Sequence, residues 1–147
     1  MTETRTTSRT SQPTNGGHHC EPKLRRVLRL NAANCVVSGV VLAVAAGPID
    51  ELLDTGRPGW IRVVGLALLP FAALCLWVAA GPLERLLKET PSIVAGDVGW
   101  VVASVVTVLL GWYSGGGIIA VLAMAVVVDT FAVLQFVAWR RLRRSTR

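Results

Sequence analysis

WIRVVGLALLPFAALCLWVAA, residues 60–80, contains one charged residue in twenty-one positions. A helix of that length extends about 30 Å, which matches the hydrocarbon core of a bilayer. Three further apolar runs of similar length lie at residues 30–47, 92–112 and 117–139. Strands of a membrane barrel alternate polar and apolar residues over about ten positions, and none of these runs does so. The sequence therefore predicts an all-α membrane protein, a bundle of four transmembrane helices.

The chain divides into three expected parts. Residues 1–25 are rich in Ser and Thr and poor in apolar groups, which predicts a disordered, basic cytoplasmic tail. Residues 26–140 form the transmembrane domain, and residues 141–147 form an Arg-rich cytoplasmic tail. Within the first tail, His18, His19 and Cys20 are metal-ligand types, but three adjacent positions cannot close a tetrahedral site. We expect neither a metal nor a cofactor.

A cleaved signal peptide is an alternative interpretation of the first apolar run. KLRRVLRL at residues 23–30 precedes CVVSGVVLAVAAG at residues 35–47, which is the order of basic and apolar regions in a secretory signal. The long polar extension before this segment, together with Asn31 and Asn34 at the start of the run, favours a retained transmembrane helix.

An eleven-residue segment occurs twice. VAAGPIDELLD at residues 44–54 and VAAGPLERLLK at residues 78–88 share seven identities. Gly-Pro after an apolar run predicts a helix stop with glycine in the left-handed conformation. The residues after it predict a short amphipathic turn at the membrane surface. Duplication and convergent use of the same helix stop both explain the match, and we favour convergence.

The two copies differ in charge and so predict the orientation. The first carries Asp50, Glu51 and Asp54, whereas the second carries Glu84, Arg85 and Lys88. Basic residues remain on the cytoplasmic side of a membrane, so the second copy is expected inside. Both chain ends are also basic, through Lys23, Arg25, Arg26 and Arg29 before the first run and Arg140, Arg141, Arg143, Arg144 and Arg147 after the last. We therefore expect a multi-pass protein of the cell membrane with cytoplasmic termini.

The net charge of +6 is explained by basic residues at the ends of the expected membrane helices. Its Lys and Arg residues flank the apolar runs and are not interleaved with aromatic residues on a folded face, so nucleic acid is not an expected partner. Anionic lipids are the expected partners of the Arg-rich ends. A second copy of the chain or an unidentified membrane protein is the other expected partner.

Small residues recur every fourth position on two of the expected helices. Such seams allow helix backbones to approach closely in lipid, within one chain or between copies. On the first helix they are Cys35, Gly39, Ala43 and Gly47; on the third they are Ala95, Gly99, Ala103, Thr107 and Gly111.

A set of polar residues lies at similar depth in the inner half of the expected helices. They are Asn31, Asn34, Ser38, Asp97, Trp100, Ser104 and Gln135. Their spacing predicts one intramembrane polar layer. We favour a structural role through hydrogen bonds between helices, worth about 0.6 kcal/mol per pair. The alternative is a cation or proton site, or the floor of a cavity for a small solute.

Asp129 stands apart from this layer. It lies about ten residues, or about 15 Å, from the cytoplasmic end of the fourth run, at the middle of the membrane. A charge at that depth costs at least roughly 2.5–3.5 kcal/mol, and no Lys or Arg occurs there. We expect its carboxyl group to be protonated, hydrogen-bonded or hydrated, and it is a candidate proton site.

Three segments resemble a family of small four-helix membrane proteins of bacteria that has no established activity. They are LRLNAANCVVSG from residue 28, GDVGWVVAS from residue 96 and FAVLQFVAWRR from residue 131. The resemblance implies a four-helix bundle in the cytoplasmic membrane. The matching positions are Asn31, Gly39, Asp97, Trp100, Ser104 and Gln135. Asp129 belongs to none of the three segments.

The sequence contains no metal-ligand cluster, nucleophile–base pair or phosphate-binding loop, so we do not expect an enzyme. The favoured hypothesis is a non-catalytic membrane component, a partner-binding or modulatory subunit. The alternative is a small proton-coupled transporter or channel that uses Asp129 and Asp97.

The orientation is testable with a reporter fused after Arg147. The excess of Arg at the C-terminal end predicts that a reporter active only in the cytoplasm works at this position. A reporter active only after export should be silent there. The reverse pattern would overturn the assignment of the acidic copy of the repeat to the outer side.

Overall fold

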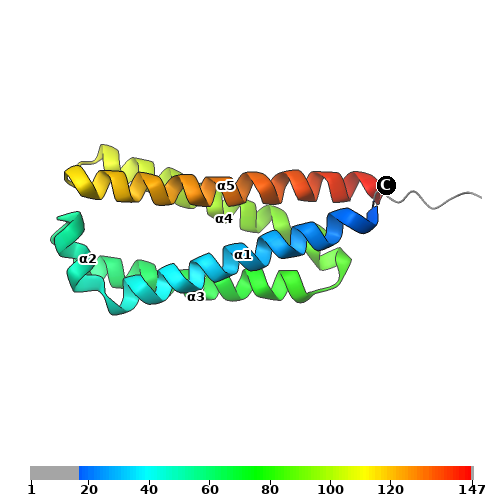
Figure 1. Ribbon diagram of the computed structural model, residues 1–147, viewed down its shortest axis with the longest axis horizontal. Coiled ribbons are helices and arrows are strands. Elements are labelled where there is room, and N and C mark those ends of the chain that lie inside the picture. The colour runs from blue at the N-terminus through cyan, green and yellow to red at the C-terminus, as the bar shows by residue number, and fades with distance from the viewer. Residues whose placement is uncertain (1–16, 147) are drawn as a thin grey trace, which may run out of the picture.

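The computed structural model describes residues 17–146, which are helical apart from short connections. The described part of the chain has no strand. Four of its helices are long and apolar enough to cross a membrane, and the short α2 is the exception (Figure 1). The helices are α1 (Gly17–Val44), α2 (Ala46–Leu53), α3 (Pro58–Ala80), α4 (Leu83–Leu109) and α5 (Gly115–Ser145).

Both end helices are longer than the sequence predicted. Residues 17–25, expected in a disordered tail, form the first turns of α1, and the Arg-rich segment from residue 141 continues α5 to Ser145. Leu24 and Leu28 explain the first extension, because they are fully buried in one apolar cluster with Leu142 of α5. Residues 1–16 of the expected tail lie outside the described residues.

The long helices are arranged in two pairs. α1 packs mainly against α3, and α4 packs against α5 (Figure 1). Contacts between α1 and α5 join the pairs. The largest apolar cluster includes Leu28 of α1, Val78 of α3, Ile93 of α4 and Leu142 of α5. At the other end of the molecule, α2 lies against α3 and α5.

Glycine allows α1 and α3 to approach closely. A Cβ atom on Gly65 would lie 2.6 Å from the backbone N of Ala43 and 2.7 Å from the carbonyl oxygen of Gly39. These are backbone atoms of α1, which cannot move aside without separating the helices. The small-residue seam of α1 is therefore used inside the chain, at Gly39 and Ala43.

The seam of α4 faces the opposite way. Ala95, Gly99 and Ala103 are exposed, and no atom lies within 4 Å of a Cβ atom placed on Gly99. Ile93 and Asp97, on the other side of the same helix, are buried. The spacing of small residues alone does not distinguish these two outcomes.

The two copies of the repeat fold differently. The first forms the separate helix α2, which is followed directly by Asp54 in the left-handed conformation. The second becomes the end of α3 and the first turns of α4 rather than an isolated amphipathic turn. The expected left-handed glycine is also wrong, since Gly81 is extended (φ −77°, ψ 175°) and Gly47 has no positive φ. Pro48 lies in the first turn of α2, where its missing N–H leaves no helical hydrogen bond unmade.

Arg25 closes the end of α3. Its Nη1 donates hydrogen bonds to the carbonyl oxygens of Ala79 (2.6 Å) and Gly81 (2.8 Å), and its Nη2 lies 2.7 Å from the Glu21 carboxylate. The last carbonyl groups of a helix have no partner within the helix, so a side-chain donor satisfies them. The start of α1 is thus bonded to the α3–α4 connection.

Aromatic residues lie near both ends of α3. Trp60 packs edge-on against Trp112, with ring centroids 6.4 Å apart, and Arg57 lies over the Trp112 ring. Arg85 lies 4.0 Å from the Trp77 ring at the other end. Trp60 and Trp77 are about 26 Å apart along the helix, close to the thickness of the hydrocarbon core. Such rings favour the membrane–water interface.

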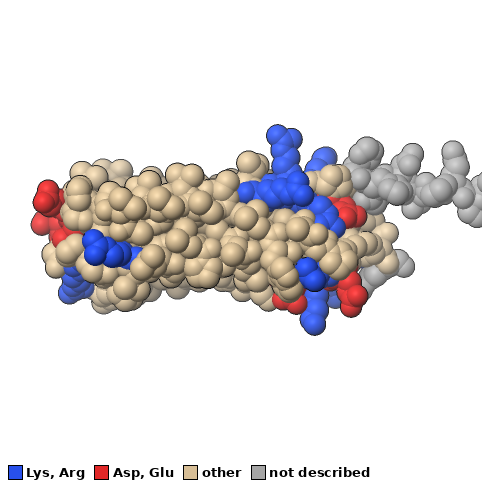
Figure 2. Space-filling view, turned by 90° about the horizontal axis from the view of Figure 1, so that it is seen from below, with Lys and Arg blue, Asp and Glu red and all other residues tan. Residues whose placement is uncertain are grey.

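On the face that Figure 2 shows, the charged groups lie toward the two ends and the middle is uncharged. Lys and Arg gather mainly toward the end where α5 finishes, and acidic groups accompany fewer basic ones at the other end. This distribution fits a molecule whose apolar middle lies in lipid.

Replacement of Gly65 by Ala tests the close contact between α1 and α3. We expect a loss of about 1–3 kcal/mol in the free energy of unfolding, because the added methyl group meets backbone atoms. Unfolding in mixed micelles measures the loss. Gly99→Ala is the matched control, since that site opens onto free space. Equal effects of the two substitutions would contradict the packing.

Candidate functional site

Asp97 is buried at the centre of the polar layer. Only 2% of its surface is exposed. Its position follows from the inward face of α4, where Ile93, Asp97 and Ser104 recur at helical spacing and are all buried. A carboxyl group in such surroundings needs hydrogen-bond partners from neighbouring helices.

Two buried amides provide these partners. Nδ2 of Asn31 donates to Oδ1 (3.2 Å) and Oδ2 (3.0 Å) of Asp97, and Nε2 of Gln135 donates to Oδ2 (3.0 Å). Asn31 lies on α1 and Gln135 on α5. The Asp97 carboxyl group therefore joins three helices at one point, and we name Asn31, Asp97 and Gln135 the amide–carboxyl triad.

The triad leaves two acceptor positions unused. An ionised carboxyl group accepts about four hydrogen bonds, and the two amides supply three. The remaining position is on Oδ1 of Asp97. Oε1 of Gln135 is also buried without a hydrogen-bond partner among the described residues. The triad thus has room for a further donor.

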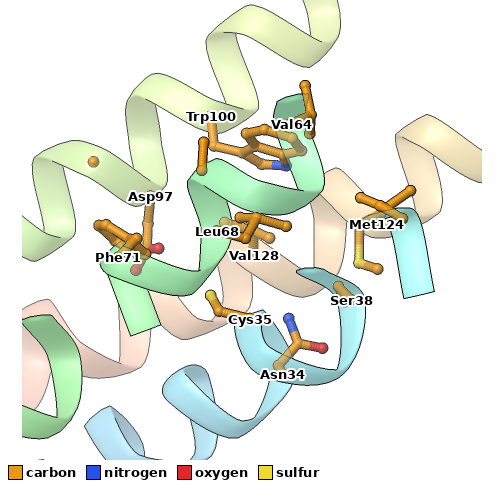
Figure 3. Close-up of a pocket in the computed structure, with 13 residues that line it drawn as sticks. Asn34, Cys35, Ser38, Val64, Leu68, Phe71, Asp97, Trp100, Met124 and Val128 are labelled. Carbon is orange, nitrogen blue, oxygen red and sulfur yellow. The ribbon is translucent and has the colours of Figure 1, made fainter. Parts of the chain in front are cut away.

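Asn34, Ser38 and Trp100 lie beside the triad rather than in it. All three line a pocket of about 220 Å³ that Asp97 also lines. Figure 3 shows side chains of α1, α3, α4 and α5 around this pocket, with Asn34 and Ser38 one turn apart on α1. The remaining polar candidate, Ser104, donates to the carbonyl oxygen of Trp100 in its own helix (2.9 Å).

The pocket wall is largely apolar. Leu68 and Phe71 of α3 and Val128 of α5 contribute to it. Sequence reasoning missed these three residues, since Leu68 and Phe71 look like any other apolar residue of a transmembrane helix. Val128 alone had an indirect indication, because it precedes Gln135 by seven positions and therefore shares its helix face.

Asp129 occupies a different environment. It is exposed on α5, next to the buried Val128, and lies outside the pocket lining. Among the described residues, Asp129 has neither a hydrogen bond nor an ion pair. The buried positions Ala125, Val128 and Ala132 face inward, which turns Asp129 to the flank of the helix. The structure therefore does not bring Asp129 and Asp97 together.

Comparison with known proteins finds no similar family model, curated protein or solved structure for this chain.

Substitution of Asp97 tests the triad. Asp97→Leu removes the one hydrogen-bond partner that the Gln135 Nε2 and Asn31 Nδ2 groups have among the described residues, at a cost of about 1–3 kcal/mol for each unpaired amide. We expect a lower unfolding temperature. Asp97→Asn should cost less, because the new amide donates to Gln135 Oε1 after a flip of that side chain.

Thermal unfolding in detergent distinguishes the two variants. Ser104→Ala is a control on the same helix, since its hydroxyl bonds only within α4. If Asn and Leu at position 97 were equally harmless, the triad would make no contribution to stability.

Proposed function

We propose that this chain is a four-helix bundle of the cell membrane, with both termini in the cytoplasm, that acts as a non-catalytic, partner-binding subunit. The contact is made by the flank of α5 that carries Asp129. The exposure of Asp129 halfway along α5 is the observation that supports this function most directly.

The depth of Asp129 gives the first argument. It lies about 21 Å from the start of α5 at Gly115 and about 15 Å from Trp139. A carboxyl group that faces lipid at this depth is costly, and polar groups in membranes usually face protein or water. A helix of another protein that covers this flank and donates a hydrogen bond to Asp129 removes the cost.

The surroundings of Asp129 give the second argument. Val126 and Val133, which share its side of α5, are both more than half exposed. They offer an apolar surface for a helix of the partner, with Asp129 as the polar anchor at its centre. This chain has no Lys or Arg at that depth, so a basic residue facing Asp129 has to come from a different protein.

The orientation and location rest on charge. The termini and the α3–α4 connection carry most of the basic residues, which supports their placement in the cytoplasm beside anionic lipids. Membership of the family of small four-helix bacterial membrane proteins is part of the same proposal. It rests on the three segments that contain Asn31, Asp97 and Gln135.

Proton-coupled transport is the second candidate. The observation in its favour is that Asp97 lines a pocket among four helices. Transport through both carboxyl groups requires a path for protons between Asp97 and Asp129. Asp129 lies on the flank of α5, outside the lining of this pocket, so we favour the partner-binding function.

Photocrosslinking in native membranes tests the contact. A photoreactive residue at Val133, about 40° around the helix from Asp129, should give a discrete adduct. The control position is Leu134, about 140° away and also exposed, which should give none. Asp129→Leu should abolish the adduct, and Asp129→Asn should retain it because the amide still forms hydrogen bonds. Equal labelling at both positions would contradict a specific contact.

Proton flux separates the two functions. Wild-type protein and Asp129→Asn are reconstituted in liposomes that contain a pH-sensitive dye, and an imposed potential drives the flux. We expect the same flux from both, because a partner-binding carboxyl group does not carry protons. A flux in the wild type that Asp129→Asn abolishes would favour the transporter, since an amide does not titrate near neutral pH.

A further inference from the structure

The pocket among the four long helices has the size of a small organic molecule. Its volume is about 220 Å³. An apolar cavity of about 150 Å³ holds benzene. The pocket therefore accommodates an aromatic ring with a short chain attached, and it is too small for most drug-sized ligands. Asp129 does not line this pocket, so a ligand bound there leaves the proposed contact at Asp129 untouched.

Asp97 is the acidic residue of the pocket lining. The groups bonded to its carboxyl group are neutral amides, so the triad supplies no cationic partner to that carboxyl group. One acceptor position on Oδ1 is unused. A cationic hydrogen-bond donor supplies the missing positive charge and also fills the unused acceptor position. Electrostatic attraction of this kind is strong in surroundings of low dielectric constant.

Trp100 adds a second feature suited to a cation. It lies one turn after Asp97 on α4, and both residues line the pocket (Figure 3). The face of an indole ring attracts ammonium groups. An indole ring in the lining makes the pocket more favourable for a cation.

The α1 wall supplies polar groups that have no other role. Asn34 and Ser38 are half-buried, line the pocket, and make no side-chain hydrogen bond to another described residue. Asn34 and Ser38 therefore add polar groups to the α1 side of the pocket.

We propose that this pocket binds a small primary amine with an apolar body. The ammonium group donates a hydrogen bond to Oδ1 of Asp97, in a pocket that Asn34, Ser38 and Trp100 also line. The apolar body packs against Leu68, Phe71 and Val128. Asn31 and Gln135 act as positioning residues, because they fix the carboxyl group without lining the pocket.

Calorimetric titration of the full chain in nanodiscs tests the proposal, with empty nanodiscs subtracted. The probes are 2-phenylethylamine and its neutral counterpart 2-phenylethanol. We expect the amine to bind at least tenfold more tightly than the alcohol. Equal affinities would show an apolar pocket that accepts a lipid chain as readily, and would overturn the proposal. Binding of neither probe would also overturn it.

Variants assign the preference to the pocket. Asp97→Asn should abolish the tenfold preference for the amine, whereas Ser104→Ala, outside the pocket on the same helix, should retain it. Val128→Phe fills the pocket without altering the triad and should weaken amine binding at least tenfold. If Asp97→Asn fails to fold, Val128→Phe still tests whether the amine binds in this pocket. Unchanged amine binding in folded Val128→Phe would place the amine elsewhere.

Discussion

A carboxyl group inside a membrane protein has to obtain its hydrogen bonds from neighbouring helices, and Asp97 does so from two. The bonds from Asn31 and Gln135 bring α1, α4 and α5 to one point. Close packing between glycines joins α3 to α1. Lipid provides no hydrophobic drive for helix association, so these two contacts define much of the arrangement. The amides also hold Asp97 at the edge of the pocket.

The sequence is enough to predict the long apolar helices and the depth of the polar residues along them. It is not enough to predict which side chains surround those residues. Length and hydropathy identify four long apolar helices because lipid demands a continuous apolar surface. Helical spacing gathers Asn31, Asp97 and Gln135 at one depth. Spacing does not say which face of α4 turns inward. The exposed Gly99 and the buried Gly65 therefore look alike in sequence, although their surroundings are opposite.

The pocket was the least predictable feature. Its walls are mostly apolar side chains from four helices, which the sequence does not distinguish from other apolar residues. The same four helices also meet in the apolar cluster of Leu28, Val78, Ile93 and Leu142, residues that are far along the chain from one another. The flank position of Asp129 was equally hidden, since a polar residue in an apolar run indicates depth but not direction. Only the buried neighbours on α5 determine that direction.

The bond from Arg25 to the end of α3 has a consequence for biosynthesis. It joins residues 54 positions apart, so it forms only after α1, α2 and α3 have all left the ribosome. Until then, the guanidinium group of Arg25 lacks the carbonyl partners that it has in the folded chain. Helix α1 acquires its final position only when its partner helix is complete.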